Sequence, residues 1–192
     1  MRYGAKMLMW APFAQENAEP AGALPTYGTA KQLGELNKVT DAPAFNEAKA
    51  YGDNGLGRYV NEFKEVPVDV EILDLTNELA SELVGAKLDS GEGKKDLHFN
   101  AEDNAPYGGL SFYINELLAG NVKKYKGIFY PKVKAAMQGK EYNTKGDTIT
   151  LVGEKLHFLG SAAKNGDWKI ESEYFATEAE AEAWVKAKLG AA

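Results

Sequence analysis

The stretch EVPVDVEILDLTNELASELVG, from Glu65 to Gly85, decides the fold class because it predicts a strand that leads directly into a capped helix. From Val66 to Ile72 every second residue is apolar, which is typical of a strand with one buried face. Thr76 can accept a hydrogen bond from an unpaired backbone N–H at the start of a helix. Gly85 suits the left-handed residue that ends a helix. The stretch therefore predicts a strand with one apolar and one acidic face, followed by a short helix.

The composition predicts one globular domain. The chain has 192 residues, of which 44% are hydrophobic and 26% are charged, enough for one core and too apolar for a disordered chain. The formal net charge of −6 disfavours tight binding to nucleic acid, where Lys and Arg must neutralise phosphates. Because cysteine is absent, disulfides, thiolate nucleophiles and cysteine zinc sites are excluded. The first residues lack the features of a signal peptide, and no stretch approaches the roughly 18 apolar residues of a membrane span, so we expect a soluble protein inside the cell that makes it.

Alternating residues and turn signals predict further strands. We expect strands over Met7–Phe13, Lys31–Thr40, Asp96–Asn100, Leu110–Leu118, Lys124–Met137, Asp147–Leu159 and Asp167–Phe175. Pro131 indicates an edge or a kink, and Asn165-Gly166 predicts a hairpin between the last two strands. A C-terminal helix is expected over residues 177–190, where Thr177 and Glu180 form a capping box. The sequence thus predicts a mainly β fold in a single domain, residues 1–192: an antiparallel β-sandwich or partial barrel with one flanking helix and a C-terminal helix.

The segment from Asp41 to Lys64 is unusual for a loop, since it combines the turn signal Asp53-Asn54-Gly55 with several aromatic residues. Two interpretations stay open. The segment is either a hairpin folded on its own core or a protruding assembly loop that packs on another subunit. For the second interpretation, the expected inter-subunit contacts are Phe45, Tyr51, Asp53, Asn54, Leu56, Tyr59 and Phe63.

The residues show no recognisable catalytic or metal centre. His98 and His157 each lie in a predicted strand without a nearby His or Cys partner, which favours a structural role. No serine lies in a G-x-S-x-G motif, and no glycine run has the spacing of a phosphate-binding loop. The carboxylates Asp69 and Glu71 belong to the outer face of a strand, where a solvated role is expected. We therefore predict no enzymatic activity, no cofactor and no bound metal.

Lysines and aromatic residues are interleaved at the start of the predicted strand Lys124–Met137 and just before it: Lys123, Lys124, Tyr125, Lys126, Phe129, Tyr130, Lys132 and Lys134. Exposed rings between lysines fit a weak platform for single-stranded nucleic acid. Lysines that block mispairing of an edge strand explain the pattern equally well.

Short motifs in a fixed order carry a resemblance that covers nearly the whole chain. They are Leu33-Gly34-Glu35-Leu36, Ala50-Tyr51-Gly52-Asp53-Asn54, Asn61-Glu62-Phe63, Leu83-Val84-Gly85, Ala105-Pro106-Tyr107-Gly108-Gly109-Leu110, Tyr130-Pro131-Lys132-Val133, Thr144-Lys145-Gly146-Asp147 and the run Glu178 to Val185. With these motifs the chain resembles a phage major tail protein of the long, non-contractile type, in the family grouped with the phi13 tail protein.

The resemblance implies a structural tail-tube protein with a β-sandwich and a flanking helix, in hexameric rings that stack into a hollow tube for DNA. Its implied partners are copies of itself and the tape-measure, tail-terminator and distal tail proteins, with DNA as non-specific cargo and no membrane. Its implied location is the virion tail, and the host cytoplasm during assembly. In such a tube, residues 41–64 would form an arm between rings, and Glu65, Asp69 and Glu71 would face a lumen that repels DNA.

Two other hypotheses stay open. The first is an inner-tube component of a contractile injection machine, such as a tail-like bacteriocin or a secretion system. The second is a small-ligand-binding β-sandwich or hydrolase, which would need a closed pocket with convergent polar groups.

Overall fold

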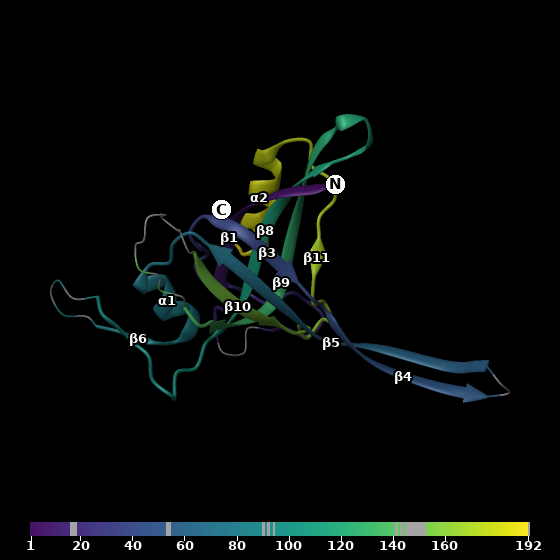
Figure 1. The fold of residues 1–192 in the computed structure, drawn as a ribbon, viewed down its shortest axis with the longest axis horizontal. Coiled ribbons are helices and arrows are strands. Elements are labelled where there is room, and N and C mark those ends of the chain that lie inside the picture. Colours follow the sequence, from purple (N-terminus) through teal and green to yellow (C-terminus); the bar gives the residue numbers. More distant parts are fainter. Residues whose placement is uncertain are drawn as a thin grey trace.

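The fold is mainly β, as predicted. The computed structural model describes residues 1–15, 19–52, 55–89, 91, 93, 95–140, 142, 144 and 153–191. In these residues a curled antiparallel sheet forms a half-barrel, with two α-helices packed against it (Figure 1). The predicted partial barrel, flanking helix and C-terminal helix are confirmed.

One large sheet contains nearly all of the described strand residues. The sheet has nine described strands, in the order β2-β1-β8-β9-β10-β5-β3, with β11 paired to β9 and β4 paired to β5. Their bounds are β1 Arg2–Pro12, β2 Lys31–Gln32, β3 Leu36–Asp41, β4 Ala44–Gly52, β5 Gly55–Ile72, β8 Tyr107–Leu117, β9 Lys123–Met137, β10 Glu154–Gly160 and β11 Ile170–Glu171. A separate small pair consists of β6 (Lys87–Leu88) and β7 (Leu97–His98), and a 3₁₀ turn spans Ala119–Asn121.

The stretch that decides the fold class forms the elements predicted for it. The four alternating apolar residues of β5, Val66 to Ile72, are buried inside the half-barrel. Helix α1 (Asn77–Val84) begins at Thr76, whose hydroxyl accepts a hydrogen bond from the backbone N–H of Leu79. It ends at Gly85, whose φ of 72° is the left-handed conformation that glycine adopts without strain.

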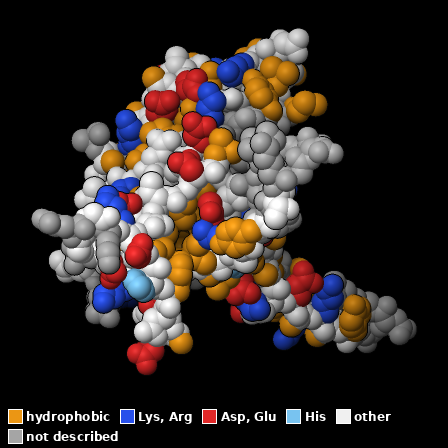
Figure 2. Space-filling model, turned by 60° about the vertical axis from the view of Figure 1, so that its left-hand side comes forward, with side chains coloured by type: hydrophobic (Ala, Val, Ile, Leu, Met, Phe, Trp, Pro, Cys, Tyr) orange, Lys and Arg blue, Asp and Glu red, His pale blue; other side chains and the backbone are white. Residues whose placement is uncertain are grey.

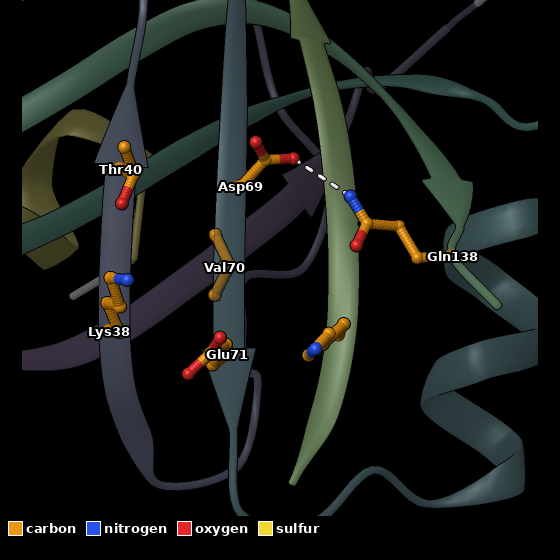
Figure 3. A pocket seen from close by; sticks show the side chains of 7 residues that line it. Lys38, Thr40, Asp69, Val70, Glu71 and Gln138 are labelled. Atoms are coloured by element: carbon orange, nitrogen blue, oxygen red, sulfur yellow. Dashed lines mark hydrogen bonds between the residues drawn. The ribbon is translucent and has the colours of Figure 1, made fainter. Parts of the chain in front are cut away.

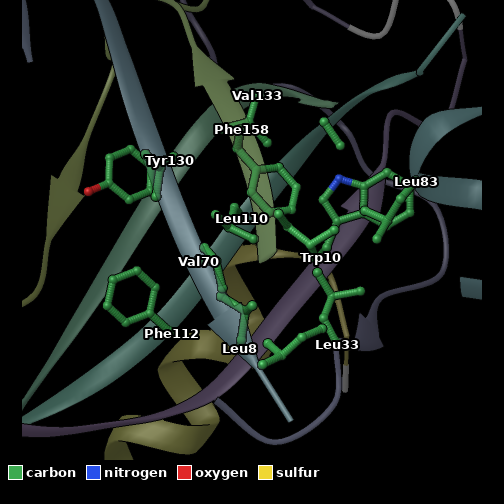
Figure 4. Close-up of a cluster of buried hydrophobic side chains, with 14 of the residues drawn as sticks. Leu8, Trp10, Leu33, Val70, Leu83, Leu110, Phe112, Tyr130, Val133 and Phe158 are labelled. Carbon is green, nitrogen blue, oxygen red and sulfur yellow. The ribbon is translucent and has the colours of Figure 1, made fainter. Parts of the chain in front are cut away.

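Two hydrophobic clusters hold the layers together. The larger cluster fills the half-barrel, where side chains from strands far apart in the sequence meet, among them Trp10, Leu110 and Phe158 (Figure 4). The smaller cluster lies between the outer side of β1, β8 and β9 and helix α2 (Glu178–Lys188). Trp184 of α2 lies so close to Gly127 that a Cβ there would come within 2.2 Å of the indole ring. The sheet is therefore covered by α2 on part of its outer side.

Three predicted elements need correction. The strand predicted over residues 31–40 is broken into β2 and β3, because Gly34 has a φ of 57° and packs directly on the backbone carbonyl of Asp74. The strand predicted over residues 167–175 is reduced to the short β11. The hairpin predicted at Asn165-Gly166 is wrong, because β10 and β11 both pair with β9 and not with each other. Residues 147–152 of the predicted strand 147–159 lie outside the described residues, and residues 154–159 belong to β10, which ends one residue later at Gly160.

Neither interpretation of the interleaved lysines holds. Strand β9 has β8 along one side and β10 and β11 along the other, so it is an inner strand. Phe129 and Tyr130 are buried and offer no stacking surface. Pro131 is tolerated in this inner strand because it lies at a shift in the β8–β9 pairing, where Gly108 and Leu110 are paired but Gly109 is not.

Candidate functional site

The most distinctive surface is a β-ribbon formed by β4 and residues 55–63 of β5, which projects from the body of the molecule (Figures 1 and 2). Antiparallel pairing extends from Phe45 opposite Phe63 to Gly52 opposite Gly55. The segment is thus a hairpin, and it also protrudes from the body of the molecule. That it packs on another subunit stays a prediction. Of the predicted contact residues, Leu56 pairs with Tyr51 at the far end. Asp53 and Asn54 lie outside the described residues.

An aromatic cluster fixes the base of the ribbon. The rings of Phe63 and Trp168 are stacked, with centroids 4.7 Å apart and an angle of 10° between their planes. Phe45 meets Phe63 edge-on at 6.0 Å and Trp168 at 6.4 Å. Phe45 and Phe63, which were predicted as contacts between subunits, therefore first make contacts within their own chain. Phe45 nevertheless keeps 42% of its surface exposed.

A β-bulge decides which face of the ribbon becomes aromatic. Ala44 pairs with Glu65 and Phe45 pairs with Phe63, so Lys64 is left without an opposite residue. One extra residue reverses the alternation of a strand. Phe63 consequently lies on the inward side of β5 and packs against the main core, although the spacing from Glu65 alone would place it outside.

Beyond its base the ribbon carries exposed aromatic side chains on one face. Tyr51 is 74% exposed and Tyr59 is 47% exposed. The ammonium of Lys49 lies 5.5 Å from the ring centroid of Tyr59 and 3.5 Å from a carboxylate oxygen of Glu47. A hydrogen bond to Glu47 raises the pKa of the Tyr59 hydroxyl. The other face presents small residues together with Arg58, Val60 and Glu62.

A partly buried polar network anchors the point where the chain leaves the barrel for the ribbon. Asp41 Oδ2 accepts hydrogen bonds from the Tyr130 hydroxyl at 2.7 Å and from Lys169 Nζ at 2.8 Å. Burial alone would raise the pKa of Asp41, but the bonds from Lys169 and Tyr130 outweigh it and lower the pKa. Burial and the adjacent carboxylate both raise the pKa of Tyr130. Asp41 therefore remains a carboxylate and holds the ribbon base to β9 and to the segment that contains Trp168.

The predicted lumen residues lie together on the outer face of β5, which they share with the outward side chains of β3 and β10. Strand pairing places Lys38 and Lys155 on either side of Glu71, and Thr40 and His157 on either side of Asp69. Figure 3 shows Lys38, Thr40, Asp69 and Glu71 around a shallow hollow of about 340 Å³. Glu65 lies on the same face and pairs with its neighbour Lys64 at 3.2 Å.

This face is charge-balanced, not uniformly acidic. Asp69 Oδ1 accepts a hydrogen bond from Gln138 Nε2 at 2.9 Å (Figure 3) and lies 2.8 Å from His157 Nδ1. A carboxylate can only accept, so the Nδ1 of His157 carries the proton. The lysines on the neighbouring strands offset the charges of Asp69 and Glu71. The position of these residues in a lumen stays a prediction. The described residues of this face carry no excess of negative charge with which to repel DNA.

The described residues contain no group of three His, Cys, Asp or Glu side chains arranged to hold a metal ion. Neither described helix has the length and apolar character needed to cross a bilayer. The chain matches no protein-family model, and no curated protein has a similar sequence. The resemblance to tail proteins therefore remains a prediction from the motifs.

Proposed function

We propose that this protein is a structural subunit of a phage tail tube, which assembles with copies of itself into stacked, hexameric rings around a lumen for DNA. The proposed location is the virion tail, with the host cytoplasm as the place of assembly. The proposed partners are other copies and the neighbouring tail proteins. The observation that carries the proposal is the projecting ribbon with Tyr51 and Tyr59 exposed on one face.

The dimensions of the ribbon suit a contact with a second subunit. Strand β4 has nine residues, which corresponds to about 30 Å at the usual rise of a strand. That length is about the diameter of a small domain. Two-stranded ribbons are at best marginally stable in water by themselves, and exposed apolar patches mark sites of interaction. Burial of a side chain such as Tyr51 in a partner would contribute about 1.5–3 kcal/mol.

The direction of the ribbon also favours an open assembly. The ribbon projects from one side of the molecule, and the loop with β6 projects from the opposite side (Figure 1). A ribbon that contacts a different surface of the next copy makes a head-to-tail interaction. Such contacts close into rings when the rotation permits and continue as filaments when it does not. Rings that stack into a tube use both kinds.

Electron microscopy of concentrated protein tests this proposal. The wild-type chain should form rings or tubes. The double variant Tyr51→Ser/Tyr59→Ser should keep its thermal stability, because both side chains are exposed, but should form no tubes. Tyr142→Ser is a matched control at an 85% exposed tyrosine outside the ribbon and should assemble normally. Wild-type protein that stays monomeric at every concentration would refute self-assembly, and normal tubes from the double variant would refute the role of the ribbon.

A further inference from the structure

The free edge of β4 provides a second kind of contact. We propose that two soluble subunits pair edge to edge through β4, as an antiparallel dimer with a two-fold axis at Ala48. Strand β4 pairs with β5 on one side, and no described strand pairs with its other side. An unpaired strand edge is a template for another strand, because its backbone N–H and C=O groups lack partners. This pairing goes beyond the proposed tube, since a two-fold contact closes on itself and does not propagate.

The sequence of β4, Ala-Phe-Asn-Glu-Ala-Lys-Ala-Tyr-Gly, is chemically self-complementary about its centre. When Ala48 lies opposite Ala48 of the partner subunit, Glu47 lies opposite Lys49 of the partner subunit. In the same register, Phe45 lies opposite Tyr51 of the partner subunit. Alternate residues of a strand share a face, so both the charged and the aromatic pairs form on one face of the joined sheet. Opposite charges and aromatic pairs are stabilising combinations across neighbouring strands.

Neighbouring registers are disfavoured, which makes the pairing specific. A shift that keeps the same faces together brings Glu47 opposite Glu47 of the partner subunit, or Lys49 opposite Lys49 of the partner subunit. Like charges directly opposite each other are destabilising. A shift by one residue moves the aromatic and charged side chains of one copy to the other face of the joined sheet. Only the register centred on Ala48 therefore places every charged side chain opposite an unlike charge and every aromatic ring opposite another ring.

The side chains that this register uses are accessible. Glu47 and Lys49 are 49% and 47% exposed, and they lie 3.5 Å apart within one chain. In the dimer they would meet the equivalent pair and form an alternating group of two acids and two bases. Phe45 and Tyr51 are 42% and 74% exposed. Because the joined area is limited to one strand edge, the dimer should be reversible and concentration-dependent.

Charge-reversal variants in sedimentation velocity experiments test the pairing. Wild-type protein should show a dimer that increases with concentration. Lys49→Glu and Glu47→Lys should each be monomeric, because like charges then face each other. An equimolar mixture of the two variants should dimerise again, because every acid then faces a base. Arg58→Glu is the matched control: it makes the same charge change on the opposite face and on β5, and it should dimerise like the wild-type chain.

A single introduced cysteine gives an independent readout, since the natural chain contains none. Opposite residues in an antiparallel pair have Cα atoms about 4.5–5.5 Å apart, which is within the range of a disulfide. Ala48→Cys should therefore form a covalent dimer on mild oxidation, whereas Val60→Cys on the other strand should not. Monomeric wild-type protein, or a mixture of charge variants that stays monomeric, would overturn the pairing. These measurements use soluble protein and are independent of tube formation, so the failure of one proposal is distinguishable from the failure of the other.

Discussion

Removal of the Tyr130 hydroxyl should weaken the anchor at the base of the ribbon in a pH-dependent way. Tyr130 is 1% exposed, and its hydroxyl donates to Asp41 Oδ2 at 2.7 Å. Tyr130→Phe keeps the ring and removes only this donor. Lys169 still donates to the same oxygen, so the carboxylate stays partly compensated. The substitution therefore isolates one hydrogen bond to a charged acceptor.

Tyr130→Phe should lower the free energy of unfolding by about 2 kcal/mol at neutral pH. A hydrogen bond to a charged group contributes roughly 1.5–3 kcal/mol. The Asp41 side chain is 33% exposed, so solvent screening places the value in the lower half of that range. A chain of this size loses about 2–4 °C of melting temperature per kcal/mol, which gives a shift of about 4–8 °C.

The destabilisation caused by Tyr130→Phe should become smaller at acidic pH. The folded-state pKa of Asp41 is lowered below its unfolded value of about 3.9. Stabilisation of the charged form is therefore fully present above that value and disappears as the pH falls through the folded-state pKa. Once Asp41 is protonated, the bond from Tyr130 joins two neutral groups and is worth about 1 kcal/mol.

Urea denaturation of both proteins, at pH 7 and in steps down to the lowest pH at which they fold, measures this difference. Tyr27→Phe is the control, because the Tyr27 hydroxyl donates to the neutral backbone carbonyl of Pro131 at 2.7 Å. The destabilisation caused by Tyr27→Phe should therefore not depend on the protonation of a carboxylate acceptor. A Tyr130→Phe cost below about 0.5 kcal/mol, or one that is the same at every pH, would refute the reasoning.

Two further predictions concern the fold. Gly34→Ala should destabilise the protein by about 2–4 kcal/mol in urea denaturation, because a Cβ would come 2.2 Å from the Asp74 carbonyl oxygen at a positive φ. The control Gly22→Ala, with a positive φ and nothing within 4 Å, should lower the free energy of unfolding by only about 1 kcal/mol. Equal losses in the two variants would contradict the packing argument. In an alkaline titration followed by phenolate absorbance, Tyr27, Tyr113 and Tyr130 should ionise well above the ordinary pKa of about 10, because burial raises the pKa of each. The contribution of these neutral hydroxyls to stability is complete below about pH 10 and is lost as the pH rises beyond it. Ionisation of all tyrosines near pH 10 without unfolding would contradict the structure.

The elements that the sequence predicts well are those in which local signals and tertiary packing agree. The alternation from Val66 to Ile72 matches the buried side of β5, and Thr76 and Thr177 cap their helices as predicted. The predictions are wrong where the choice of strand-pairing partner decides which strands form. Asn165-Gly166 does form a turn, since the Gly166 N–H donates to the Ala163 carbonyl. The flanking segments nevertheless pair with β9, a choice that no local residue pattern encodes.

The candidate site was predictable in part. The aromatic content of residues 41–64 pointed to the ribbon, but the bulge at Lys64 hides the alternation that would have identified its strands. Trp168 and Lys169 were not predicted as partners of this segment, because they lie more than 100 residues further along the chain. The outward positions of Asp69 and Glu71 follow from alternation. Their lysine neighbours depend on the pairing of β3 and β10 with β5, which the sequence does not reveal.

An image reconstruction of the assembled particles tests the central claim most directly. The claim is that the ribbon is an arm for neighbouring subunits, anchored by Asp41 and Trp168 and exposing Tyr51 and Tyr59. The account predicts stacked rings in which the density of each ribbon crosses a subunit boundary and both tyrosines are buried against the next copy. Rings in which every ribbon lies in solvent or against its own subunit would contradict it.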